Sequence, residues 1–390
     1  MDRIKLLQLF ILIGIFSCSI DKKTIVDDKI DEIKQNYAPD ARVAIFNINA
    51  SDDNPINLTG ETNLYAAKEE LISALTKLNI EIEDQIKILP DESIDNKKFA
   101  LINVSVANLR GKPTHSAELV TQALLGTPVN ILKENNGWYL VQTPDNYISW
   151  TNSGSLLRLD QNELKQWKAN SKIIFLDTYG FSYHRESEKR ISDLVAGNVL
   201  ELENENNTDW FVRYPDGRLA RIIKAQASKI TLWNDNINIT DTSITEAAMS
   251  LIGVPYLWGG TSTKGLDCSG FTKTIYMLHG YIIPRDASQQ VHQGELIDAK
   301  RNFSRLKTGD LLFFGRKDEG GSEKVVHVGL WLGNNQFIHA SGDVHISSMD
   351  STADNYDSYN YNRYLRTKRI ISENSGLDNI MQQVYGYYKK

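Results

Sequence analysis

The chain has 390 residues, of which 41% are hydrophobic and 24% are charged. This composition is ordinary for a globular protein, and the length allows two or three domains that each bury a core. The formal net charge is −6, and this mildly acidic balance gives no reason to expect a nucleic-acid partner.

The first residues, MDRIKLLQLFILIGIFSCS, predict an export signal rather than a folded element. Arg3 and Lys5 give a basic start, and the apolar run over residues 6–16 has the length of a signal-peptide core. A small residue directly before Cys18 resembles a bacterial lipobox, in which the cysteine is lipidated after cleavage. We therefore expect residues 1–17 to be a signal peptide and the mature protein to be a periplasmic or surface lipoprotein of the cell envelope. An ordinary cleaved signal and an uncleaved apolar anchor are the alternatives.

Residues 18–98 are expected to form a partly helical N-terminal region. The stretch AAKEELISALTKLNIEIEDQI predicts an amphipathic helix, because Leu71, Leu75 and Leu78 recur at helical spacing with charged residues between them. No motif in this region points to catalysis.

Short apolar runs separated by turn residues follow up to residue 233 and predict two small antiparallel barrels. Residues 99–160 resemble a bacterial SH3-like domain, above all between Trp138 and Trp150. WYLVQTPDNYISW in this stretch and WFVRYPDGRLARI further along share an aromatic start, a strand, a Pro-Asp turn and a second strand. Residues 161–233 are therefore expected to be a second copy of the same barrel.

Residues 243–372 predict a separate α+β domain, and residues 373–390 form a C-terminal tail. This domain contains Cys268, the only cysteine outside the first 18 residues. Exported proteins commonly pair their cysteines, so a lone one is either a core filler or a reactive thiol. Phe271 and the apolar residues one and two turns later predict a helix with Cys268 in its first turn. The unpaired N–H groups at the start of a helix favour a thiolate there.

A nucleophilic cysteine needs a base, and VVHVGLWLGNNQFIHASG offers two histidines on neighbouring strands. Strand alternation puts His327 and Gly329 on one face, and a turn at residues 333–335 then sets His339 opposite Gly329. The two histidines become diagonal neighbours roughly 7–8 Å apart, so one imidazole can act as a base while the other orients it. A zinc site made of both histidines and Cys268 is an alternative, although its ligand spacing is a weak metal signal.

Six motifs of this domain, PYLWGG, LDCSGF, IPRDASQQ, GDLLFF, HVGLWLG and FIHASG, occur in the order seen in NlpC-type cysteine peptidases. These are papain-like enzymes that cleave peptidoglycan stem peptides, and the resemblance covers residues 244–371. It implies a papain-like α+β domain in which Cys268 is the nucleophile, His327 the general base and His339 the residue that orients it. It also implies that Tyr256 lies near the nucleophile, where it helps to bind the substrate or the oxyanion. No metal or organic cofactor is implied.

Two SH3-like domains ahead of such a domain resemble γ-D-glutamyl-L-diamino-acid peptidases of the dipeptidyl-peptidase VI type. In these enzymes the first SH3-like domain forms the wall at one end of the substrate cleft. The resemblance implies that Glu118, Tyr147 and Asp286 hold the free amino terminus of the substrate, because an ammonium group in a partly dry pocket needs carboxylates and a hydroxyl acceptor. Asp267 and Ser269 would line the pocket for D-glutamate. The motif that contains Asp286 continues into two further substrate-binding positions, Ala287, where family members often carry serine, and Ser288.

The sequence thus predicts an exported hydrolase that cleaves between γ-D-glutamate and L-lysine or diaminopimelate. Its partners would be stem peptides with a free N-terminal L-alanine, and it would touch the membrane only through a lipid anchor. The first alternative is an endopeptidase that acts on intact cell wall and uses the SH3-like domains as wall anchors. The second is a non-catalytic envelope adaptor.

Overall fold

The computed structural model describes residues 21–237, 239–371 and 384–386. The expected signal peptide and the expected lipidation site, Cys18, lie outside the described residues. The chain divides into two compact units, of which the first ends at Ile88 and the second begins at Leu89. No helix in the described ranges is both long enough and apolar enough to cross a membrane.

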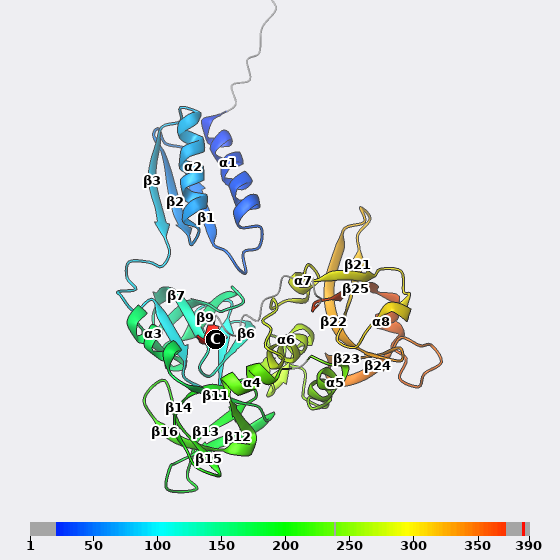
Figure 1. Cartoon of the computed structure of the whole chain (residues 1–390). Coiled ribbons are helices and arrows are strands. Elements are labelled where there is room, and N and C mark those ends of the chain that lie inside the picture. Colours follow the sequence, from blue (N-terminus) through cyan, green and yellow to red (C-terminus); the bar gives the residue numbers. More distant parts are fainter. Residues whose placement is uncertain (1–20, 238, 372–383, 387–390) are drawn as a thin grey trace, which may run out of the picture. The chain divides into compact units, whose positions relative to one another are not determined.

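The first unit is a three-stranded sheet with two helices (Figure 1). Its elements are α1 (Lys22–Tyr37), β1 (Phe46–Ala50), β2 (Ile56–Thr62), α2 (Tyr65–Lys77) and β3 (Ile82–Ile88). β1 runs antiparallel to β2, and β3 runs parallel to it. The parallel pair requires a crossover connection, which α2 provides. The apolar sides of both helices bury their side chains against the sheet and give this unit a core of its own.

The prediction of one helix through residue 86 is wrong in its second half. α2 ends at Lys77, and Asn79 takes a left-handed backbone conformation with a φ of 54°, which stops the helix. Leu78 is 50% exposed and does not extend the apolar stripe. The following residues instead pair with β2 along seven consecutive positions, so pairing with a strand elsewhere in the unit overrides the local helical pattern.

Two antiparallel barrels follow, and they share one strand order. The first has sheet order β10-β4-β7-β8-β9-β5-β6 and the second β13-β12-β16-β15-β14-β11-β17. Read from its other end, the second order repeats the first strand for strand, which agrees with the repeat seen in the sequence. The strands of the first barrel are β4 (Phe99–Ile102), β5 (Val106–Arg110), β6 (Leu119–Leu124), β7 (Pro128–Asn135), β8 (Trp138–Gln142), β9 (Ile148–Asn152) and β10 (Leu156–Leu159).

A helix connects the two barrels, and each barrel has its own apolar core. The linking helix and the strands of the second barrel are α3 (Gln161–Ala169), β11 (Lys172–Phe175), β12 (Tyr179–Tyr183), β13 (Arg190–Val195), β14 (Val199–Glu205), β15 (Asp209–Arg213), β16 (Leu219–Ile223) and β17 (Ala227–Lys229). Short 3₁₀ helices lie at Ser153–Ser155, at Lys224–Gln226 and, in the last domain, at Phe303–Arg305.

The last domain is α+β, as predicted, with a six-stranded antiparallel sheet of order β20-β25-β21-β22-β23-β24. Helix α4 (Ile230–Asn236), which precedes this domain, contacts β11 and β17 of the second barrel. The helices of the last domain are α5 (Asp241–Met249), α6 (Cys268–Leu278), α7 (Ala287–Gln290) and α8 (Ser358–Asn362). Its strands are β18 (Thr261–Ser262), β19 (Gly265–Leu266), β20 (Glu295–Asp298), β21 (Leu311–Lys317), β22 (Glu323–Gly333), β23 (Gln336–Ser341), β24 (Asp343–Ser348) and β25 (Tyr364–Arg369).

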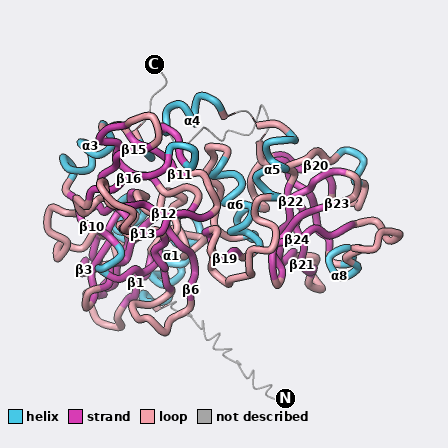
Figure 2. The backbone as a smooth tube through the Cα atoms, turned by 90° about the horizontal axis from the view of Figure 1, so that it is seen from below, coloured by secondary structure: helices cyan, strands magenta, loops and turns pink. Residues whose placement is uncertain are grey.

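The core of this domain lies between α6 and the sheet, and Figures 1 and 2 both show α5 and α6 beside it. α6 carries Phe271 and Ile275, which pack against Val328 and Leu330 of β22 and against apolar side chains of β23. Cys268 belongs to the same core. Packing of one helix face against one sheet face therefore fixes the first turn of α6 next to the middle of β22.

Candidate active site

Cys268 is the first residue of α6, as the sequence predicts. Asp267 caps the helix, and its side chain accepts a hydrogen bond of 2.7 Å from the backbone N–H of Gly270. The thiol is buried, and the backbone N–H groups of Val328 and Ser269 both hydrogen-bond to its sulfur. The sulfur therefore touches the residue that directly follows His327 on β22.

The expectation that the helix start favours a thiolate does not describe the resting site. Burial raises the pKa of the Cys268 thiol to about 12, and the neighbouring Asp267 carboxylate acts in the same direction. The hydrogen bonds to the sulfur and the charge of Arg285 lower the pKa by less. Desolvation thus outweighs the effect of the helix terminus, and the thiol is neutral near pH 7.

The two histidines meet across the β22–β23 hairpin. Leu330 pairs with Ile338, and this register sets Gly329 opposite His339. The turn is tighter than predicted, because it consists of two residues, Asn334 and Asn335, with φ values of 51° and 58°. A bulge between the pairs formed by Trp331 and Gly333 compensates for the missing turn residue and preserves the expected register.

A chain of hydrogen bonds connects the histidines to a third strand. Nε2 of His327 lies 2.8 Å from Nδ1 of His339, and Nε2 of His339 lies 3.0 Å from Oγ of Ser347 on β24. Burial lowers the pKa of His327 well below 6.5 and that of His339 to about 4, so both rings are neutral near pH 7. No hydrogen bond among the described residues involves Nδ1 of His327, which leaves this nitrogen available to the thiol.

Tyr256 lies near Cys268. Burial raises the pKa of its phenol to about 12, with a smaller contribution from the charge of Cys268. The backbone N–H of Tyr256 donates to the carbonyl of Gly342, and the residue also bridges to Leu266, which precedes α6. The tyrosine therefore presents a protonated hydroxyl, as a residue that binds a carbonyl or an oxyanion would.

Asp267 and Ser269 are engaged by a buried arginine that the sequence reasoning missed. Arg285 binds both carboxylate oxygens of Asp267, at 3.1 and 2.5 Å, and donates to Oγ of Ser269 at 2.9 Å. Burial pulls the pKa of Arg285 down, but the Asp267 carboxylate outweighs it and the net direction is up. The only signal for this ion pair was the presence of Arg285 in the IPRDASQQ motif. That Asp267 and Ser269 line a substrate pocket stays a prediction.

The residues predicted to hold an amino terminus lie where the first barrel contacts the last domain. The hydroxyl of Tyr147 donates to Asp286 over 3.2 Å, and the carboxylate of Glu118 accepts a hydrogen bond of 2.7 Å from the indole N–H of Trp258. Asp286 caps α7, whose first two residues are Ala287, which is buried, and Ser288, which is partly exposed. The structure thus joins Tyr147 to Asp286, and it ties Glu118 to the loop that carries the PYLWGG motif.

The described part of the chain contains no group of three or more His, Cys, Asp or Glu side chains that could hold a metal ion. The alternative of a zinc site made of Cys268, His327 and His339 therefore has no support in the geometry.

Comparison with known proteins agrees with this architecture. Residues 253–366 match the NlpC/P60 family, and residues 109–156 match the bacterial dipeptidyl-peptidase Sh3 domain. The chain is 32% identical over 234 residues to a gamma-D-glutamyl-L-lysine dipeptidyl-peptidase of Bacillus cereus, an alignment that covers 58% of this chain and 68% of the relative. It is 30% identical over 263 residues to dipeptidyl-peptidase 6 of Lysinibacillus sphaericus, with 64% of this chain and 92% of the relative covered.

Among solved structures, an NlpC/P60 family protein from Bacillus cereus superposes with a TM-score of 0.60 at 24% sequence identity, covering 70% of this chain and all of the other. That likeness concerns the fold. The match of the last domain, the match of the first barrel and the identity to relatives over most of their length agree with one another. The chain therefore belongs to the NlpC/P60 family of peptidases.

Proposed function

We propose that this protein hydrolyses the bond between γ-D-glutamate and L-lysine or diaminopimelate in peptidoglycan stem peptides that have a free N-terminal L-alanine. The observation that carries the proposal is the contact of Tyr147, in the first barrel, with Asp286, in the peptidase domain. A hydroxyl and a carboxylate from two different domains meet there, and one of these domains also presents Cys268. The names of the two relatives, which specify dipeptide release, support the same substrate class.

The chemistry follows from two neutral partners. The Cys268 thiol passes its proton to Nδ1 of His327, and the sulfur attacks the γ-carbonyl carbon of the D-glutamyl residue. His339 orients His327 through the hydrogen bond between their rings and stabilises the imidazolium that forms. His327 then protonates the leaving amine, and water hydrolyses the thioester. Since burial disfavours each charge alone, thiolate and imidazolium form together, where each offsets the other.

In this proposal the first barrel closes one end of the substrate cleft. An ammonium group at that end can be held by the carboxylates of Asp286 and Glu118 and the hydroxyl of Tyr147, because charge-assisted hydrogen bonds to carboxylates are the strong ones. A peptide whose amine is blocked loses its charge and gains bulk at this position. The proposed activity is therefore limited to peptides already released from the sugar chain.

The decisive assay incubates purified protein with L-Ala-γ-D-Glu-L-Lys, and with its diaminopimelate counterpart, and measures release of L-Ala-γ-D-Glu by chromatography. We expect turnover by the intact protein and a loss of at least about 10³-fold in Cys268→Ala, since removing a nucleophile removes the covalent route. Equal turnover by both proteins, or none by the intact one, contradicts the proposal.

Acetylation of the amino terminus separates the proposal from the endopeptidase alternative. An enzyme that works on intact cell wall meets stem peptides whose amine is already in an amide bond, so it gains nothing from a free ammonium group. We expect the N-acetylated tripeptide to be cleaved at least about 100-fold less efficiently, in line with the loss of a charged group from a site built to pair with it. Equal cleavage of both peptides would favour the endopeptidase.

We further propose that the protein is exported to the cell envelope and anchored there by lipid on Cys18. The basic start, the apolar run and the small residue before Cys18 support this. Growth with a radiolabelled fatty acid should label the intact protein, and Cys18→Ala should abolish the label. Label that persists in this variant contradicts the lipid anchor.

A further inference from the structure

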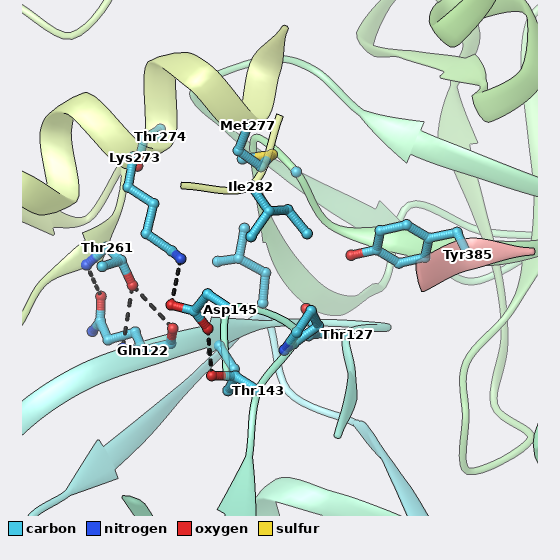
Figure 3. Close-up of a pocket in the computed structure, with 14 residues that line it drawn as sticks. Gln122, Thr127, Thr143, Asp145, Thr261, Lys273, Thr274, Met277, Ile282 and Tyr385 are labelled. Atoms are coloured by element: carbon cyan, nitrogen blue, oxygen red, sulfur yellow. Dashed lines mark hydrogen bonds and ion pairs between the residues drawn. The ribbon is translucent and has the colours of Figure 1, made fainter. Parts of the chain in front are cut away.

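A small cavity marks the contact between the first barrel and the peptidase domain. It has a volume of about 90 Å³, and Figure 3 shows its walls. Leu124 and Thr127 come from the barrel, Met277 comes from α6, and Tyr385 comes from near the C-terminus of the chain. One end of the cavity is closed by two charged side chains that face each other, Lys273 of α6 and Asp145 of the barrel.

The two charges form a well-satisfied buried pair. Nζ of Lys273 lies 2.5 Å from Oδ2 of Asp145, and their side chains are only 17% and 6% exposed. The same ammonium donates to the carbonyl of Ile283 at 3.0 Å, and the hydroxyl of Thr143 donates to the other oxygen of Asp145 at 2.5 Å. Burial alone would raise the pKa of Asp145, but the Lys273 ammonium outweighs it and the net direction is down.

Each member of the pair lies close to one end of the proposed substrate site. Asp145 belongs to a tight turn in which the N–H of Thr143 donates to the carbonyl of Tyr147 and Asn146 has a φ of 66°. This turn places the Tyr147 hydroxyl within hydrogen-bond distance of Asp286. Lys273 stands five residues after Cys268 in α6, about 7.5 Å along the helix axis. The ion pair thus connects the helix of the nucleophile to the turn of the amine-binding tyrosine.

A second set of contacts fixes the neighbouring strand of the barrel. Gln122 on β6 accepts from the backbone N–H of Thr261 through its side chain, while the hydroxyl of Thr261 donates to the Gln122 carbonyl, both at 3.0 Å (Figure 3). Nε of Arg285 donates to the hydroxyl of Thr121 on the same strand at 3.1 Å. These neutral and charge-assisted bonds hold the barrel in place, so the Lys273–Asp145 pair is not needed merely to keep the domains attached.

We propose that Lys273 and Asp145 are positioning residues that set the distance between the amine-binding end of the cleft and Cys268, and so select peptides whose free amine lies one dipeptide away from the scissile bond. This inference rests on the proposed function. A buried ion pair is a poor source of stability, because desolvation offsets its attraction, but its geometry is strict. Strict geometry is what a site needs when a misplacement of about 1 Å costs about 100-fold in rate.

The test compares kcat/KM for L-Ala-γ-D-Glu-L-Lys with kcat/KM for its N-acetylated form, in the full chain and in variants. The decisive variant is the double substitution Asp145→Leu/Lys273→Met, which removes both charges. A single substitution would leave one charge buried without its partner, a change that is strongly destabilising. The matched control is Lys23→Met/Asp27→Leu, the same chemical change at a solvent-accessible pair of α1 with a distance of 2.6 Å and side-chain exposures of 30% and 45%.

We expect the double variant to lower the preference for the free amine at least about 10-fold, mainly through the free-amine substrate, while the control pair changes it less than about 2-fold. An unchanged preference in a folded double variant overturns the inference. If circular dichroism shows that the double variant does not fold, the ratio of kcat/KM for the two peptides is measured in Thr143→Val instead. This variant removes only the hydroxyl that orients Asp145. A fall of at least about 3-fold is then expected, and no fall overturns the inference.

The intact protein distinguishes a failure of this inference from a failure of the proposed function. An intact protein that cleaves neither peptide, or cleaves both equally well, contradicts the proposed function before any variant is considered. An intact protein that prefers the free amine, together with variants that keep this preference, contradicts only the role of the ion pair.

Discussion

His339 lies inside the peptidase domain with a partner on each ring nitrogen, His327 on one side and Ser347 on the other. Protonation would place a positive charge on a ring that is almost inaccessible to solvent, and for this reason the pKa of His339 falls to about 4. A charge on this ring would also oppose the imidazolium that His327 becomes in the proposed mechanism. In that mechanism the low pKa of His339 keeps the second ring neutral while His327 carries the proton taken from Cys268.

The same shift predicts how stability depends on pH. Unfolded histidine binds a proton near pH 6.5, whereas folded His339 does so only near pH 4. Between these values the unfolded chain binds more protons, so the free energy of unfolding falls as the pH falls, by at most about 3 kcal/mol for one such histidine. We expect this contribution to be complete above pH 6.5 and lost near pH 4. Thermal unfolding followed by circular dichroism between pH 7 and pH 4 measures it.

The variant His339→Gln should show a shallower decline of the melting temperature over this interval than the intact protein. His184→Gln, the same substitution at an exposed histidine of the second barrel, should keep the full slope. The comparison concerns slopes, so it holds even if His339→Gln lowers the melting temperature at every pH. Parallel curves for the intact protein and His339→Gln would contradict the assignment of the acid sensitivity to this ring.

At the scale of elements, the sequence predicts those features of helices and strands that depend on residues close together in the chain. Period-2 and helical spacing placed Cys268 at a helix start and His327 diagonal to His339, and the structure shows both. The hairpin turn was assigned one residue too many, yet the register was right because a bulge compensates. The assignment of β3 to a helix failed because the residue pattern of β3 does not reveal that β2 is its pairing partner.

Contacts that depend on how further elements fold against each other had no signal in the local pattern. Ser347 meets His339 only because β24 folds back on β23, and Arg285 meets Asp267 only because α7 follows α6 along the same side of the domain. Asp145 and Lys273 lie 128 positions apart, on two domains that the sequence suggests separately. The thiolate expectation failed for a related reason, since burial depends on the packed core and not on the position of Cys268 in its helix.

At the scale of the whole molecule, all residues assigned to the proposed chemistry lie in the unit that begins at Leu89. The first unit has a complete core of its own, formed by α1, α2 and the face of a three-stranded sheet. None of the predicted site residues in the described part of the chain belongs to it. The two barrels, by contrast, share an apolar cluster in which Leu101 and Leu159 of the first pack with Trp167 and Ile174 of the second barrel region.

This division predicts different outcomes for two truncations. A chain that starts at residue 89 should fold and cleave L-Ala-γ-D-Glu-L-Lys with a kcat/KM within about 2-fold of the full chain, because it keeps every core that surrounds the site. A chain that starts at residue 161 loses the first barrel, and with it Glu118, Tyr147 and the partner of Lys273. Apolar surface that packed against the first barrel is then exposed and the amine-binding groups are lost, so we expect both a lower melting temperature and at least about a 100-fold loss on the free-amine peptide. Steady-state kinetics with both peptides, together with circular dichroism, measures these effects. A large loss on removing residues 1–88 would show that the first unit takes part in the reaction.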